Sequence, residues 1–205
     1  MNEFTQFLKS RQKCNLAMVA VNIIVFIVLG IIGNTENAEF MARHGAVYAP
    51  YVMEGQYWRL FTSMFLHFGF EHLAYNMVSL LFLGDVLEKA AGWARYLFIY
   101  FGGGLCGGLL SLGMELKTGH YAVSAGASGA IFAVIGAIFY IALRNRKTFG
   151  QSNMRRLVLM IVLMIMQGVV DKGVDNYAHL GGLIGGFLLA VLVWHPKKRQ
   201  VVHLP

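Results

Sequence analysis

Two residue types that act together in nucleophilic catalysis, a serine and a histidine, stand at the starts of two apolar segments. Ser128 lies in the sequence GASG at 126–129, where a polar stretch gives way to an apolar one, and His179 lies in the sequence AHLGG at 178–182. A serine hydroxyl becomes a nucleophile when a neighbouring base takes its proton, and histidine is the commonest such base. The pair predicts acyl-transfer chemistry, provided that the fold brings both residues together.

The segments that carry these residues are predicted to be membrane helices. Of the 205 residues, 57% are hydrophobic and 13% charged, and the mean hydropathy is +0.58. In soluble domains about a quarter of the residues are charged. A helix needs about 20 consecutive apolar residues to span the hydrocarbon core of a bilayer. The predicted fold class is an all-α membrane protein, a bundle of six transmembrane helices, with short fourth and fifth members: 16–32, 73–91, 96–114, 130–143, 157–170 and 177–194.

The basic residues indicate the orientation of this bundle. With the N-terminus inside, thirteen of the seventeen Lys and Arg residues fall on inner segments, which is the asymmetry typical of the cytoplasmic side. We therefore expect one membrane domain over 1–205 with both termini cytoplasmic. Residues 1–15 form the inner N-terminal segment, 34–71 an outer interfacial loop rich in aromatic residues, and 195–205 a basic inner tail.

Several other classes of protein are disfavoured by the same residues. The net charge of +7 comes from the inner clusters, and no basic face with interleaved aromatic residues predicts nucleic-acid binding. The stretch 16–32 is longer than the apolar core of a cleavable signal peptide and lacks a small-x-small site after it. Cys14 and Cys106 lie on different elements, so neither a disulfide framework nor a metal site is predicted.

Alternation of direction places the distinctive polar residues at one depth. The second, fourth and sixth helices run inward, so their first residues all lie near the outer face. His72 and Asn76 begin the second helix and fall within roughly 40° of each other on one face, while Ser128 and His179 begin the fourth and sixth. A lone serine, histidine or asparagine in a membrane helix is often structural. Their shared depth favours a functional site instead.

The glycines around these residues predict close helix packing. Gly126 and Gly129 remove side-chain bulk beside Ser128, and Gly182 and Gly186 form a GxxxG face one turn after His179. Such faces let two membrane helices approach closely. The fourth and sixth helices are therefore expected to pack together.

Five motifs, in order, resemble those of the rhomboid family of intramembrane serine proteases, and the resemblance covers nearly the whole chain. They are Trp58-Arg59 in the outer loop, His72-x-x-x-Asn76, Glu88-x-x-x-Gly92, Gly126-x-Ser128-Gly129 and Ala178-His179-x-x-Gly182-x-x-x-Gly186. The GxSG string alone is a weak signal, since soluble hydrolases use a similar one after a strand.

The resemblance implies a Ser128–His179 dyad that cleaves transmembrane segments of membrane proteins near the outer face through an acyl-enzyme. His72, Asn76 and the Ser128 backbone N–H would stabilise the oxyanion. Glu88, Trp58 and Arg59 would have structural roles. It further implies a multi-pass protein of the cell membrane, no cofactor or metal, and substrates whose transmembrane helix is destabilised.

Two positions leave alternatives open. Phe132 stands where family members often carry a tyrosine, so the ring is expected to stack on His179 without the phenol hydroxyl. Asp175, one turn before His179, either orients the histidine or caps the helix, as an Asp-Asn pair at a helix start commonly does.

Three other functions are weighed. His67 with Glu71-His72 superficially matches an H-x-x-E-H zinc motif, but the histidines lie about 140° apart on a helix and Gly69 interrupts it; His67 is expected in the interface with its polar tip toward water. A catalytically inactive rhomboid-like protein that binds membrane helices is the alternative function. A transporter would need charged or broken helices at mid-membrane.

The fifth helix, with Met164, Met166 and Gln167, is the expected movable element, although its methionines are also typical packing residues.

Overall fold

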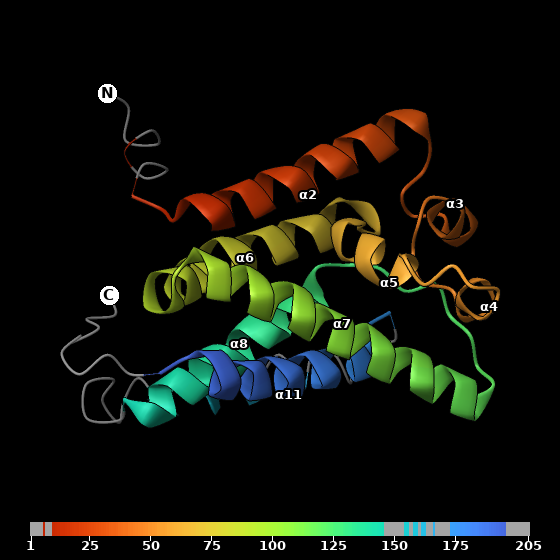
Figure 1. The fold of residues 1–205 in the computed structure, drawn as a ribbon. Helices are drawn as coiled ribbons and strands as arrows, with labels where there is room; N and C mark the ends of the chain where they lie inside the picture. The colour runs from red at the N-terminus through yellow and green to blue at the C-terminus, as the bar shows by residue number, and fades with distance from the viewer. Residues whose placement is uncertain are drawn as a thin grey trace.

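Helices account for most of the described chain. The computed structural model describes residues 6, 10–145, 154–155, 158–159, 161–162, 166 and 173–195. Its long helices are α2 (Lys13–Ile32), α6 (Gly69–Ala91), α7 (Trp93–Thr118), α8 (Ser128–Arg144) and α11 (Asn176–Val193) (Figure 1). Four short helices lie between α2 and α6: α3 (Ala38–Arg43), α4 (Ala49–Met53), α5 (Arg59–Thr62) and the 3-10 helix η1 (Ser63–Phe65).

The long helices alternate in direction. In Figure 1, α6, α8 and α11 run toward the left end of the bundle, whereas α2 and α7 run toward the right, so α2 begins at the same end at which α11 finishes. This agrees with the predicted alternation of these five elements. The remaining predicted helix, 157–170, lies largely outside the described residues, and Met164 and Gln167 lie outside them altogether.

Length and composition make several of these helices suitable for crossing a membrane. Among the described residues α2, α7 and α11 are long and apolar enough to do so, and α8 is a shorter apolar helix. α6 has 23 residues, but Glu71 lies in its first turn and Asp85, Glu88 and Lys89 lie near its end. The six-helix count and the cytoplasmic placement of both termini remain predictions.

α8 is the central helix of the bundle. Every residue from 129 to 138 is buried, because α11, α7 and α6 all pack against it. A helix that is apolar on all sides is suited to such a position. With 17 residues, α8 is shorter than α2 and α7, as its short apolar stretch predicts.

Glycines bring α8 and α11 into backbone contact, as the GxxxG face predicts. A Cβ on Gly182 would overlap the Gly129 carbonyl, and a Cβ on Gly186 would overlap the Ala133 carbonyl. α7 also approaches α11 closely, since a Cβ on Gly107 of α7 would lie 2.5 Å from the carbonyl oxygen of Ala178 in α11. Small residues thus let three helices meet with little space between their backbones.

The start of α2 is held by acidic side chains from the far end of α6. Glu88 is buried and accepts hydrogen bonds from the backbone N–H groups of Cys14 at 3.3 Å and Asn15 at 2.7 Å. Asp85 accepts one from the Gln12 N–H at 2.6 Å. The first N–H groups of a helix lack intrahelical partners, so these carboxylates cap α2 and favour its positive dipole end.

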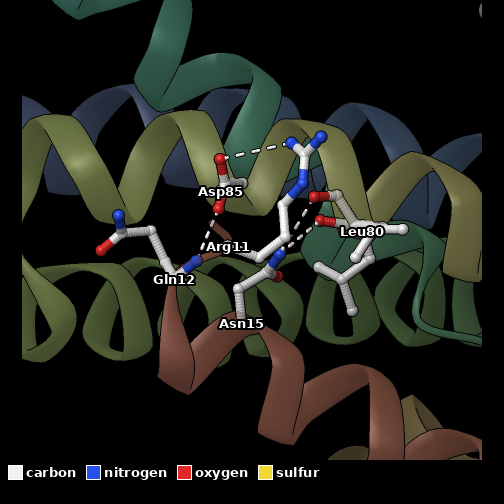
Figure 2. Close-up of polar contacts among 6 residues, drawn as sticks. Arg11, Gln12, Asn15, Leu80 and Asp85 are labelled. Atoms are coloured by element: carbon white, nitrogen blue, oxygen red, sulfur yellow. Dashed lines mark hydrogen bonds and ion pairs between the residues drawn. The ribbon is translucent and has the colours of Figure 1, made fainter. Parts of the chain in front are cut away.

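Further hydrogen bonds join the same two helix ends. We call this region the α2–α6 junction and define it by Arg11, Gln12, Asn15, Asp85 and Glu88. Figure 2 shows the Asn15 amide directed at the backbone of α6, where it donates to the Leu80 carbonyl at 2.9 Å, and the Arg11 guanidinium 3.5 Å from Asp85. The Tyr96 hydroxyl of α7 donates to Asn15 Oδ1 at 2.8 Å. The junction therefore ties together three helices.

We expect Glu88→Ala to lower the free energy of unfolding by about 1–3 kcal/mol, because one buried and one partly buried N–H group lose their carboxylate acceptor. Lys89→Ala, an exposed change in the same turn, is the control and should have little effect. Unfolding of the purified variants in detergent, followed by circular dichroism, measures both. Equal unfolding midpoints for Glu88→Ala and Lys89→Ala would contradict the capping role.

Candidate active site

Ser128 and His179 occupy matching places on the two helices that pack most closely. Ser128 is the first residue of α8, and His179 lies in the first turn of α11. Gly129 and Ala178, which adjoin them in sequence, face each other across the helix contact: a Cβ on Gly129 would lie 3.5 Å from the Ala178 carbonyl oxygen. Both Ser128 and His179 are half-buried. The fold thus brings the two helix starts together.

Phe132 holds the His179 ring in place. The two rings stack with their centroids 4.2 Å apart and their planes at 15°, and Phe132 is 2% exposed. The stacking expected from the sequence is confirmed. Phe132 lies one turn after Ser128, so the two residues share a face of α8, and the imidazole of His179 packs on that face.

The nitrogens of His179 differ in their surroundings. Nδ1 is buried and has no hydrogen-bond partner among the described residues. Nε2 is therefore the nitrogen left for proton exchange with a reacting group. Asp175 caps α11 instead of bonding this ring, because its Oδ1 accepts the Ala178 N–H at 2.9 Å. The capping alternative for Asp175 is confirmed.

The His72 ring lies against Gly126, on the side where any other residue would carry its Cβ. A Cβ on Gly126 would lie 2.8 Å from His72 Cε1, 2.9 Å from His72 Nε2 and 3.7 Å from Ser128 Oγ. His72 Nδ1 accepts the Phe68 N–H at 3.4 Å, which leaves the proton of a neutral ring on Nε2. His72 therefore presents an N–H donor on the side of Gly126 next to Ser128.

Asn76 lies on the same face of α6 as His72. Its Nδ2 donates to the His72 carbonyl at 3.0 Å, and the side chain is buried. The spacing predicted this arrangement. One Nδ2 hydrogen is used within α6, and the amide group has a second one.

The prediction for His67 is wrong in one respect. His67 does lie beside His72, with ring centroids 5.2 Å apart, but it is completely buried instead of turning its polar tip to water. Its Nε2 accepts the Ala127 N–H at 3.4 Å, which fixes the residue before Ser128. The short separation of His67 and His72 in the sequence predicted that they lie close together. The hydrogen bond to Ala127, sixty residues later, had no signal in the sequence.

Trp58 and Arg59 organise the loop instead of contacting the serine. Arg59 is buried and donates to the carbonyls of Ala42 and Ala46, the latter at 2.9 Å. Its guanidinium stacks on the rings of Tyr51 at 4.7 Å and Trp58 at 4.8 Å. Burial lowers the pKa of Arg59, while Tyr51 opposes this shift.

Glu88 is also remote from the candidate site, since it lies four turns beyond His72 on α6 in the α2–α6 junction. Gly92 follows it with a positive φ of 86° where α6 ends and α7 begins. Within the described ranges, no group of three or more His, Cys, Asp and Glu side chains could hold a metal ion.

His67 generates a prediction for the pH dependence of stability. Burial, with a smaller contribution from the neighbouring His72, lowers its pKa to about 3, although the Phe65 backbone opposes the shift. Between about pH 6.5 and pH 3 the unfolded chain binds a proton at His67 and the folded chain does not, so the free energy of unfolding falls as pH drops through this window. His67→Gln, which keeps an acceptor and does not titrate, should remove part of that fall.

Unfolding in detergent at pH 7.5, 6, 5 and 4 measures this effect. His120→Gln replaces an exposed histidine and should retain the wild-type pH dependence. A His67→Gln protein that loses stability as steeply as the wild type would rule out His67 as the titrating group.

Gly126 generates a second prediction, with Gly119 as its control. Both have positive φ, 137° and 72°, so alanine at either position strains the backbone by about 1 kcal/mol or more. A Cβ at Gly119 meets nothing within 4 Å, whereas one at Gly126 meets the His72 ring. We expect Gly126→Ala to slow fluorophosphonate labelling of Ser128 about 100-fold and Gly119→Ala to leave it near wild type. Equal labelling of the two variants would contradict this.

Comparison with known proteins identifies the family of this chain. A sequence model of the Rhomboid domain matches residues 54–196. Rhomboid protease GluP of Bacillus subtilis (strain 168) is 37% identical over 179 residues, which cover 87% of this chain and 34% of that protein. Putative rhomboid protease YdcA of the same strain is 34% identical over 149 residues, 73% of either chain.

A third relative, Rhomboid-like protease 1 of Toxoplasma gondii, is 31% identical over 176 residues, 78% of this chain and 58% of that protein. The chain thus spans about a third of the length of GluP and just over half of the Toxoplasma protein. The family model covers the described elements from α5 to α11, including Ser128 and His179. The resemblance in the sequence is confirmed, and the chain belongs to the rhomboid family of membrane proteins.

Proposed function

We propose that this protein is an intramembrane serine endopeptidase that cleaves transmembrane segments of other membrane proteins, with Ser128 as the nucleophile and His179 as its base. The observation that carries the proposal is the stacking of His179 on Phe132, one turn after Ser128 on the helix that α11 touches through glycine. Relatives named as proteases, at 34–37% identity, support the reaction class.

The chemistry runs through an acyl-enzyme. Ser128 Oγ attacks the carbonyl carbon of a peptide bond while His179 Nε2 takes the hydroxyl proton, and His179 then returns that proton to the departing amine. Water next attacks the ester while His179 takes one of its protons; the ester bond to Ser128 Oγ then breaks, His179 returns the proton to Oγ, and the acid is released. Since no acid contacts Nδ1 among the described residues, the ring is oriented by Phe132 packing instead of a carboxylate.

The negative oxygen formed in each attack needs donors that are already in place. His72 Nε2–H lies beside Gly126 on the side facing Ser128, the Asn76 amide lies on the same face of α6, and the Ser128 N–H belongs to the first turn of α8, where N–H groups lack intrahelical partners. A single such donor is worth about 3–4 kcal/mol in the transition state of soluble serine proteases.

The position of the site suggests its substrates. Ser128, His179 and His72 all lie in the first turns of their helices, near an end of the bundle where water can reach the acyl-enzyme. We place this end at the outer face of the cell membrane, with six membrane helices and both termini cytoplasmic. A continuous helix hides its carbonyls in hydrogen bonds, so the substrate is a membrane protein whose transmembrane segment unwinds easily near that face.

Covalent labelling tests the function. A fluorophosphonate serine-hydrolase probe, added to the protein in detergent or liposomes, should label the wild type and neither Ser128→Ala nor His179→Ala, because the attack needs the hydroxyl and its base together. Ser79→Ala and His120→Ala are controls at other serine and histidine positions and should label normally. His72→Ala and Asn76→Ala should label more slowly.

Cleavage of a panel of single-span substrates in liposomes should follow the same ranking of variants. If folded wild type neither labels nor cleaves, the catalytic proposal fails, and the protein is then the inactive helix-binding alternative. Labelling that persists in Ser128→Ala would instead place the nucleophile at another serine.

A further inference from the structure

Asp175 contacts more segments than a helix cap requires. Its Oδ1 accepts the Ala178 N–H at 2.9 Å, as an N-cap does. Its Oδ2 accepts two further hydrogen bonds, from Ser111 Oγ at 2.6 Å and from Ser124 Oγ at 2.8 Å. A cap would leave this second oxygen to water, so the two serines indicate an additional role.

The two serines belong to different parts of the fold. Ser111 is a buried residue of α7. Ser124 lies four residues before Ser128 in the segment that leads into α8, which we call the nucleophile loop (119–127). Hydrogen bonds from a hydroxyl to a carboxylate are stronger than those between neutral groups. The Ser111 bond has the short length typical of that class, and the Ser124 bond has an ordinary O–H···O length. Asp175 thus joins α11, α7 and the nucleophile loop.

Other contacts fix the nucleophile loop without touching α11. Ser124 forms a two-way backbone pair with Val47, each hydrogen bond being 2.9 Å long. The Gly126 N–H donates to the Ser63 carbonyl at 2.9 Å. On the α7 side, Glu115 accepts the Ala122 N–H at 3.1 Å. The Asp175 carboxylate differs from these three anchors, because it belongs to the segment that leads into α11, the helix of His179.

We propose that Asp175 is a positioning residue that sets the start of the base helix relative to the nucleophile loop, through Ser124 and Ser111. The proposal rests on the proposed dyad function. Asp175 precedes His179 by one helical turn, and the His179 N–H bonds the Asp175 carbonyl at 3.1 Å. A shift of Asp175 away from Ser124 therefore moves the imidazole relative to Ser128, although Asp175 touches neither side chain.

Replacement by serine separates this role from capping. Asp175→Ser keeps a good N-cap but lacks the second oxygen that bonds Ser111 and Ser124. Asp175→Asn is the conservative variant, since its amide can cap and still donate to both hydroxyls. Ser124→Ala removes the tie to the loop and leaves the cap intact. Glu115→Ala is the matched control, because it removes the bond from α7 to Ala122 of the same loop and leaves the Asp175 hydrogen bonds to Ser111 and Ser124 in place.

The readouts are the second-order rate constant of fluorophosphonate labelling, kcat and KM for a liposomal substrate, and the unfolding midpoint. We expect Asp175→Ser and Ser124→Ala each to lower the labelling rate and kcat about tenfold or more, with KM and the unfolding midpoint near wild type. Asp175→Asn should recover much of the rate. Glu115→Ala should change it little.

The double variant Asp175→Ser/Ser124→Ala should be no slower than the slower single variant, because both changes break one interaction. Wild-type labelling rates in Asp175→Ser and Ser124→Ala, or effects that multiply in the double variant, would overturn the proposal while leaving the dyad intact. Should Asp175→Ser fail to fold, Ser124→Ala compared with Glu115→Ala decides the matter. An unreactive wild type would mean that the proposed function itself fails, and the proposal with it.

Discussion

The closeness of α8 and α11 is the constraint on which the site depends. At two successive turns a glycine of α11 lies against a backbone carbonyl of α8, where even a methyl group would overlap. Lipid offers no hydrophobic force to press two helices together, so tight van der Waals packing over small residues is what holds them. The stacking of His179 on Phe132 follows from this separation, since a wider gap would carry the imidazole off the ring.

Much of this could be predicted from the sequence because it depends on periodicity. Apolar stretches predict the long helices, and the four-residue spacing predicts that His72 and Asn76 share a face of α6. The GxxxG pattern predicts the backbone contact at Gly182 and Gly186. Each of these is a local regularity that helix geometry converts directly into a position in space.

Contacts between distant segments could not be predicted in this way. The sequence predicts His67 in the interface with its polar tip toward water, but its acceptor nitrogen meets the Ala127 N–H across the fold. The sequence leaves open whether Asp175 caps the helix or orients His179, and its bonds to Ser111 and Ser124 depend on the packing of three segments. Glycine at 126 was expected to save space, whereas its φ of 137° also requires a residue without a Cβ.

The α2–α6 junction also bears on the order of biosynthesis. α2 leaves the ribosome more than fifty residues before Asp85 and Glu88, the carboxylates that cap its first N–H groups. Until those residues are made, the uncapped turn must find its hydrogen bonds in water or lipid headgroups, because hydrocarbon supplies none. We therefore expect a newly inserted α2 to keep its first turn at the membrane surface until the end of α6 supplies the capping carboxylates.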